Sequence, residues 1–276
     1  MDNYSVLMSV YFREKPEHLK ACIESMLAQT LPTNDFVIVC DGPLTSELDA
    51  VLDHFDRTHP GLFQLVRLPE NVGIGAAANI GLQHCKNEYI AKMDADDISV
   101  PRRCEIEMEL FRQNPKLSVV GGYIAEFDED PQTPFAIRQV PLQHKDILVF
   151  ARRRQAFNNV SVMYKKSAVE AVGGYRPLKR CEDFDLYTRL LHTGHVTRNV
   201  DTVLVSARVD RGGASRRASM ATLKGISASR WYAVKIGFAS LGDYLFCVLG
   251  ELFIMVTPRC VSRYVYQKFL RQECCE

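Results

Sequence analysis

Short apolar runs alternate with helix-like patterns along the first part of the chain. Four runs have the length and composition of strands: residues 5–11, 36–40, 62–68 and 89–93. Three segments between them place apolar residues at helical spacing: 16–27, 44–55 and 73–85. This alternation predicts an α/β fold with a mostly parallel central sheet and helices on both of its faces.

The pattern becomes less regular after residue 101. It predicts a helix, a strand and an exposed acidic loop, in turn at residues 102–113, 117–123 and 126–134. It then predicts a strand, a helix and a second strand or hairpin, in turn at residues 158–164, 181–191 and 196–209. We assign these elements to a first domain, residues 1–217.

A broad apolar helical surface follows, so we expect residues 218–276 to form a helical C-terminal extension. Lys235, Asp243 and Glu251 leave no uncharged stretch of the roughly 18 residues that a membrane span needs. The basic residues beyond them suit a segment that lies on an anionic membrane surface: Arg259, Arg263, Lys268 and Arg271. Packing of the helices on the first domain is an equal alternative.

Polar residues stand where the predicted strands end. The first three strands lead to Tyr11, Asp41 and Asn71, and the fourth leads to the cluster Asp94-Ala95-Asp96-Asp97. Because the carboxyl ends of parallel strands meet at one edge of a sheet, we expect these side chains to face one ligand site.

The cluster at residues 94–97 has the chemistry of a divalent cation site. Mg²⁺ and Mn²⁺ need hard oxygen ligands, and one or two carboxylates suffice when phosphate oxygens and water complete the shell. An acidic turn that caps the helix after Pro101 is the alternative. A helix-loop-helix calcium site is excluded, because residues 98–100 lack the alternating oxygen ligands and the glycine that it requires.

The turn at residues 73–78 fits the dinucleotide fingerprint G-x-G-x-x-A and favours a competing hypothesis, an NAD-dependent oxidoreductase. It follows the third predicted strand, whereas such a fingerprint normally follows the first. Its small residues also suit a helix that lies close to a diphosphate or to the sheet. A noncatalytic nucleotide-binding protein is a third hypothesis.

A second acidic group opens the helix predicted at 181–191. Glu182, Asp183 and Asp185 offer a general base that could remove a proton from an attacking hydroxyl. Acidic capping of a helix N-terminus is again the alternative.

Composition narrows the partners and the compartment. The 34 basic and 33 acidic residues leave a net charge of +1, so no global field attracts nucleic acid. Nine cysteines, none in a C-x-x-C arrangement, favour a reduced, cytoplasmic setting. The N-terminus has no basic region followed by a long apolar one, so we expect no secretion.

Taken together, the motifs resemble those of the family 2 glycosyltransferases, which have the GT-A nucleotide-binding fold. The resemblance covers roughly the first 210 residues and is carried by five segments: Ser9-Val10-Tyr11, Val39-Cys40-Asp41-Gly42-Pro43, Asn71-Val72-Gly73 with Asn79, Lys92-Met93-Asp94-Ala95-Asp96-Asp97, and Cys181-Glu182-Asp183-Phe184-Asp185-Leu186. The Asp41-Gly42-Pro43-Leu44 form, the arginine-rich stretch near 208–217 and the C-terminal helices are similar to those of bacterial capsule, exopolysaccharide and O-antigen glycosyltransferases.

The resemblance implies roles for individual residues. Asp96 would coordinate Mn²⁺ or Mg²⁺, and Asp183 would be the catalytic base of an inverting transfer. Tyr11 and Asp41 would contact the nucleobase, which favours uracil, and Asp94 would contact the ribose or the sugar. The other residues implied at the donor site are Asn71, Asn79 and Lys92. Many relatives have a histidine after the position of Arg208, and because this chain has none there, we expect Arg208 or Arg211 to contact the leaving diphosphate.

These observations predict an enzyme that moves a hexose or aminohexose from a UDP-sugar to a growing, lipid-linked oligosaccharide in the synthesis of a surface polysaccharide. We expect a cytoplasmic protein with peripheral contact to the inner face of the cytoplasmic membrane.

Overall fold

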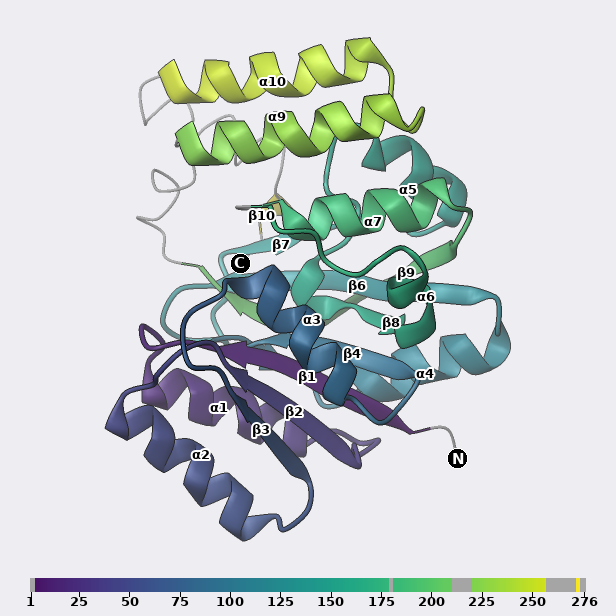
Figure 1. Cartoon of the computed structure of the whole chain (residues 1–276). Helices are drawn as coiled ribbons and strands as arrows, with labels where there is room; N and C mark the ends of the chain where they lie inside the picture. The colour runs from purple at the N-terminus through teal and green to yellow at the C-terminus, as the bar shows by residue number, and fades with distance from the viewer. Residues whose placement is uncertain (1–2, 179–180, 210–219, 257–271, 274–276) are drawn as a thin grey trace.

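The structure is a computed structural model that describes residues 3–178, 181–209, 220–256 and 272–273 (Figure 1). Its first part repeats strand and helix three times and ends on a fourth strand: β1 (Tyr4–Val10), α1 (Pro16–Leu27), β2 (Asp35–Cys40), α2 (Ser46–Thr58), β3 (Phe63–Arg67), α3 (Ile74–His84) and β4 (Tyr89–Asp94). The four strands pair in parallel in the order β4-β1-β2-β3. The predicted alternation is therefore confirmed here, and the chain reverses its direction of travel across the sheet between β1 and β4.

The following part adds shorter and less regular elements: β5 (Ile98–Ser99), α4 (Arg103–Gln113), β6 (Leu117–Phe127), β7 (Ala136–Arg138), α5 (His144–Ala151), η1 (Asn159–Ser161), β8 (Met163–Lys165), α6 (Lys166–Ala171), α7 (Glu182–His192) and β9 (Val196–Arg208). β8 lies antiparallel between β4 and β6, whereas the long strands β6 and β9 run parallel. The strand β10 (Gln272–Glu273) pairs with β7 at the outer edge. The sheet is therefore parallel in its first half and mixed in its second.

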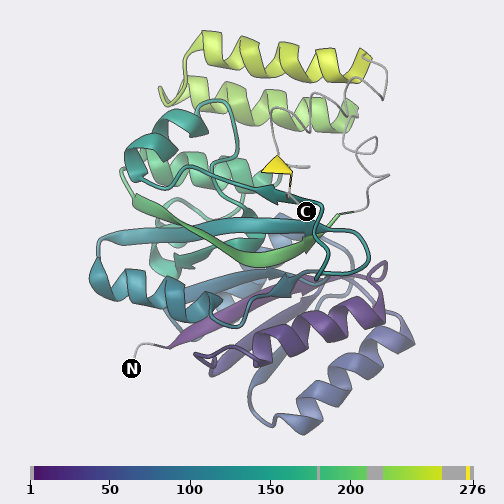
Figure 2. The ribbon, with the colours of Figure 1, turned by 180° about the vertical axis from the view of Figure 1, so that it is seen from behind.

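Helices cover both faces of the sheet, as predicted. Figure 2 shows α1, α2 and α4 on one face, and their apolar side chains form one core cluster with β1, β2 and β4. The second cluster joins the opposite face to α3, α5, α6 and α7. α3 lies very close to the sheet, because a Cβ added at Gly81 would stand 2.4 Å from Leu7 Cδ1 and 2.6 Å from Val39 Cγ2. The small residues of this helix therefore serve its packing on the sheet.

Two sequence predictions need correction. The strand expected at 158–164 is a 3-10 turn followed by β8, because Asn158 donates its amide to the carbonyl oxygens of Gly122 and Arg138 and so leaves the ladder. The loop expected at 126–134 begins only at Asp128. Glu126 belongs to β6 and is buried.

Two helices follow residue 219, namely α9 (Met220–Lys235) and α10 (Leu241–Val256). α9 packs on α7, and α10 packs on α9 as the outermost layer in Figure 1. Within the described residues, none of the helices combines the length and the apolar character needed to cross a bilayer.

Candidate active site

The ends of β1, β2 and β4 meet at one cavity. Ser9 of β1 stands opposite Asp94 of β4, and Val10 stands opposite Cys40 of β2. A cavity of about 430 Å³ opens at this edge, and its lining residues are Ser9, Val10, Tyr11, Glu14, Asp41, Asn71, Gly73, Ile74, Asp94, Ala95 and Asp96. The structure therefore brings together the residues at four strand ends that the sequence pattern placed at one edge.

Asp41 organises one wall of the cavity. Its Oδ1 accepts the backbone N–H of Val72 at 2.7 Å, and its Oδ2 accepts the N–H of Gly73 at 3.1 Å and the side-chain amide of Asn71 at 3.0 Å. Gly42 allows this contact, since a Cβ there would stand 2.9 Å from the nitrogen of Asn71. The carboxylate holds the 71–73 loop, and a direct contact between Asp41 and a nucleobase stays a prediction.

The acidic loop forms the opposite wall. Burial, together with the carboxylates of Asp94 and Glu14, raises the pKa of Asp96 from its ordinary 3.8 to about 7. Burial and the charges of Asp96 and Asp94 also raise the pKa of Asp97 well above its ordinary value. Asp97 turns away from the cavity and accepts the backbone N–H of Arg208 at 2.7 Å, which joins the loop to β9.

This wall has the charge that a divalent cation would neutralise. Asp96 and Asp94 both reach the cavity from one loop, and the pKa of Asp96 is raised first by burial and then by the negative charges of Asp94 and Glu14. Within the described ranges, no group of three His, Cys, Asp or Glu side chains encloses a metal position. The residues fit a cation that takes only one or two protein ligands and completes its shell with phosphate oxygens and water.

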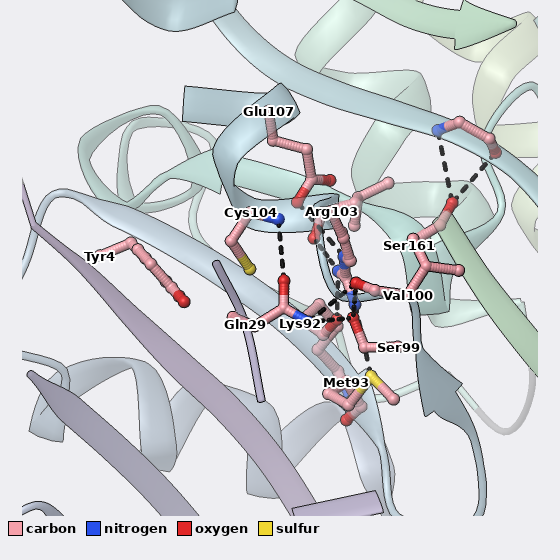
Figure 3. Close-up of polar contacts among 12 residues, drawn as sticks. Tyr4, Gln29, Lys92, Met93, Ser99, Val100, Arg103, Cys104, Glu107 and Ser161 are labelled. Carbon is pink, nitrogen blue, oxygen red and sulfur yellow. Dashed lines mark hydrogen bonds and ion pairs between the residues drawn. The ribbon is translucent and has the colours of Figure 1, made fainter. Parts of the chain in front are cut away.

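Buried polar groups hold β4 from behind the cavity (Figure 3). Arg103, fully buried, donates to the carbonyl oxygens of Lys92 at 2.7 Å and Val162 at 3.1 Å and forms an ion pair with Glu107 at 3.2 Å. Burial raises the pKa of Glu107 to about 7 despite this arginine. The side chain of Gln29 similarly ties α1 to Ser99 and to the start of α4. The acidic loop thus projects from a fixed backbone.

We expect Arg103→Met to lower the free energy of unfolding by about 3–5 kcal/mol, because it leaves the buried Glu107 without its partner. Urea unfolding at pH 8 measures the change. The double variant Arg103→Met with Glu107→Leu should regain part of the loss, since the unpaired carboxyl is then removed. Wild-type stability in the single variant would contradict the role given to this pair.

Lys92 is also buried, with its side chain only 2% exposed. Its ammonium donates to Asp94 Oδ1 and to the carbonyl oxygen of Met93, both at 3.0 Å. Lys92 is not among the residues that line the cavity, and its direct contact with a donor stays a prediction.

Three other predicted donor residues have different outcomes. Asn79 exchanges two hydrogen bonds of 2.7 Å with the backbone of Tyr175, so both ends of its amide are occupied outside the cavity. Arg208 donates to the carbonyl oxygens of Asp96 at 3.3 Å and Asp128 at 3.0 Å and thereby braces the acidic loop. Its contact with a diphosphate stays a prediction. Arg211 lies outside the described residues.

The second acidic group opens α7 beside the cavity. A Cβ added at Gly75, which follows the cavity residues Gly73 and Ile74, would lie 3.5 Å from the side chain of Glu182. Burial raises the pKa of Glu182, and the charges of Asp183 and Asp94 contribute. Asp183 accepts the side-chain amide of Gln155 at 2.8 Å. Cys181, just before the helix, has a positive φ of 62°, an unusual conformation for a side chain with a Cβ.

Sequence reasoning missed Glu14 and Gln155. Glu14 stands four residues beyond the end of β1 and reaches the cavity because the chain turns back there, with its N–H bonded to the carbonyl oxygen of Tyr11. Gln155 lies in a segment without periodic pattern. Neither residue stands in a motif that could have indicated its place.

A cavity at the carboxyl edge of a parallel sheet, beside the point where strand order reverses, is the usual ligand site of open α/β folds. The family model described as glycosyl transferase family 2 matches residues 5–173, and the chain belongs to this family. It is a glycosyltransferase. The family assignment disfavours the oxidoreductase hypothesis.

Relatives match over nearly their whole length. An "Uncharacterized glycosyltransferase" of Haemophilus influenzae is 37% identical over 98% of this chain and 99% of its own. The amylovoran biosynthesis glycosyltransferase AmsE of Erwinia amylovora is 32% identical, covering 96% and 98% of the two chains. The UDP-Gal:alpha-D-GlcNAc-diphosphoundecaprenol beta-1,3-galactosyltransferase of Escherichia coli is 28% identical, covering 98% and 97%.

Solved structures share the fold. The mannosyltransferase PcManGT of Pyrobaculum calidifontis, in complex with GDP-Man and Mn²⁺, has a TM-score of 0.65 at 16% identity, over 91% of this chain and 69% of that one. S. aureus TarS 1-349 in complex with UDP has a TM-score of 0.64 at 14% identity, over 97% and 76%. The GT-A class of the fold, predicted from the motifs, is confirmed.

Proposed function

We propose that the cavity binds a UDP-sugar together with Mn²⁺ or Mg²⁺, and that the enzyme transfers a hexose or aminohexose with inversion to a lipid-linked oligosaccharide. The observation that carries this proposal is the meeting of Tyr11, Asp41, Asp94 and Asp96 at one cavity, with the pKa of Asp96 raised to about 7. The Escherichia coli relative supports the donor and acceptor classes, because its name specifies UDP-Gal and a diphosphoundecaprenol acceptor.

In this proposal Asp96 holds the cation, and Asp94, oriented by Lys92, contacts the ribose or sugar. A bound cation would neutralise charge on the departing diphosphate. Tyr11 and the Asp41-bound loop border the base. Asp183 takes the proton of the acceptor hydroxyl during attack, from the N-terminus of α7 next to the cavity.

A panel of sugar nucleotides tests the donor class. With Mn²⁺ present, the protein should slowly hydrolyse one UDP-sugar, and release of UDP is the readout. EDTA should abolish the release. Absence of hydrolysis with every donor, even after long incubation, would instead favour a noncatalytic nucleotide-binding protein.

The affinity for Mn²⁺ should rise with pH between 6 and 8. A proton competes with the cation for Asp96, whose pKa is raised to about 7, so each pH unit below 7 should weaken binding by up to about tenfold. Titration calorimetry with MnCl₂ at several pH values measures this. A constant affinity over the range would argue that Asp96 is not a ligand.

We also propose that the C-terminal helices bind a membrane surface. The inner helix α9 packs on α7, in keeping with the packing alternative. The outer helix α10 supports the membrane alternative, because it exposes large apolar side chains: Leu241, Leu245, Phe246, Leu249, Leu252 and Phe253. The basic segment 152–154 adjoins this face, with the Arg153 guanidinium 5.0 Å from the ring centre of Phe246. Apolar and basic groups side by side suit an anionic bilayer surface. The basic residues from Arg259 to Arg271 lie outside the described residues.

We expect the full-length protein to sediment with vesicles that contain phosphatidylglycerol and to sediment less with pure phosphatidylcholine. Leu249→Asp with Phe253→Asp should reduce this binding by tenfold or more, since each change places a charge on the inserted face. Val149→Asp, which also replaces an exposed apolar residue but lies on α5, is the matched control. Equal sedimentation of all variants would contradict the proposal that the apolar side chains of α10 bind the membrane.

A further inference from the structure

The segment that joins α5 to the 3-10 turn reaches Asp183 through one side chain. Gln155 Nε2 donates to Asp183 Oδ2 at 2.8 Å, and the backbone N–H of Phe184 donates to Oδ1 at 2.7 Å. Among the described residues, each carboxylate oxygen of Asp183 accepts one hydrogen bond, and these two bonds orient the side chain. A carboxylate oxygen that accepts one hydrogen bond has a further lone pair that can take a proton from a hydroxyl group.

The same segment is held by both C-terminal helices. Arg230 of α9 donates to the carbonyl oxygens of Ala151 and Arg152, both at 3.2 Å, and its guanidinium lies 3.5 Å from the ring centre of Phe184. Arg153 forms an ion pair of 2.5 Å with Asp243 of α10. Residues 151–153 are thus fixed between α7 and the C-terminal extension, immediately before Gln155.

We propose that Gln155 is a positioning residue for Asp183, presented by a segment that the C-terminal helices hold in place. The inference rests on the proposed role of Asp183 as the base. A neutral amide donor suits this task, because it fixes the carboxylate and stabilises its charged form without neutralising it, as a lysine or arginine would. The C-terminal extension thereby becomes part of the catalytic unit.

The charge of Asp183 acts on the pKa of several neighbouring groups: Cys181, Glu182 and Tyr187 at α7, Tyr175 from the preceding loop, and Arg230 from α9. Substitution of Gln155 leaves all of them in place. A change in pH dependence that follows this substitution can therefore be assigned to the lost amide.

Transfer activity of Gln155→Leu and Gln155→Glu over pH 5–9 is the test. We expect kcat to fall roughly 10-fold to 100-fold in Gln155→Leu, less than for loss of the base itself. The affinity for UDP with Mn²⁺ should stay within about threefold of wild type, since Gln155 does not line the cavity. The acidic limb of the profile should move to higher pH, and farther in Gln155→Glu, where a second carboxylate repels the first.

Gln64→Leu is the matched control. Gln64 also donates its amide to an aspartate, Asp35 at 2.5 Å, but at the amino ends of the strands. The Gln64→Leu variant should have a lower melting temperature than wild type and an unchanged kcat and pH profile. Asp183→Asn separates the two hypotheses. If it is inactive while Gln155→Leu keeps wild-type kcat and pH profile, the positioning role is wrong; if it is fully active, the proposed base is wrong.

Discussion

Asp96→Asn should abolish Mn²⁺-dependent binding of UDP and, with it, sugar transfer, while the metal-free protein becomes more thermally stable. The amide has the same shape but binds a hard cation poorly. The pKa of Asp96 is raised from 3.8 to about 7, so the folded protein binds more protons than the unfolded chain between these values. The free energy of unfolding of the wild-type protein therefore falls as pH rises through this window. Asp96→Asn cannot ionise, so its free energy of unfolding does not fall in this way.

Differential scanning at pH 8 and pH 4 measures the effect on stability. The gain should be present at pH 8, where the carboxylate is charged, and should be mostly lost near pH 4, where the carboxyl of the folded protein is protonated and that of the unfolded chain is about half ionised. Asp56→Asn makes the same chemical change on the exposed surface of α2 and should alter neither UDP binding nor stability. Full transfer activity in Asp96→Asn would show that Asp96 is not needed to bind the cation.

Asp183→Asn should lower the rate of transfer by about 10²-fold to 10⁴-fold, the usual contribution of a general base. Binding of UDP with Mn²⁺ should persist, because Asp183 does not line the cavity at the strand ends. Steady-state kinetics with a UDP-sugar, combined with UDP calorimetry, separates the two effects. Loss of binding and rate together would show that Asp183 supports the donor site instead.

Helix capping is the simpler explanation for an aspartate at this position, and Asp146→Asn controls for it. Asp146 lies in the first turn of α5, as Asp183 does in α7, and it does not line the cavity. The two variants should have similar effects on stability, of about 0.5–2 kcal/mol at most. Only Asp183→Asn should affect transfer.

The parallel half of the fold could be predicted from the sequence because its strands are apolar runs, largely buried in β1, β2 and β4, that are separated by clear helical spacing. Every residue of β2, for example, is buried. The mixed half of the fold could not be predicted from the sequence, because its elements are short and depend on tertiary contacts. Asn158 breaks the expected strand through bonds to Gly122 and Arg138, one of them 36 residues away in sequence. The hydrophobic periodicity of a sequence does not indicate such long-range contacts.

The same distinction applies to the site. Tyr11, Asp41 and Asp96 follow strand ends, so topology alone places them together. The motif position of Lys92 and Asn79 did not reveal that one is buried behind Asp94 and the other bonded to Tyr175. Those assignments depend on the direction of each side chain, which pattern does not determine.

Titration of the wild-type protein with UDP, with and without Mn²⁺, tests the central claim most directly. If the cavity at the strand ends holds a nucleoside diphosphate through a cation at Asp96, added Mn²⁺ should tighten binding of UDP by at least about tenfold. NADH should not compete. Equal affinity for UDP with and without the cation, or tight binding of NADH in its place, would contradict the account.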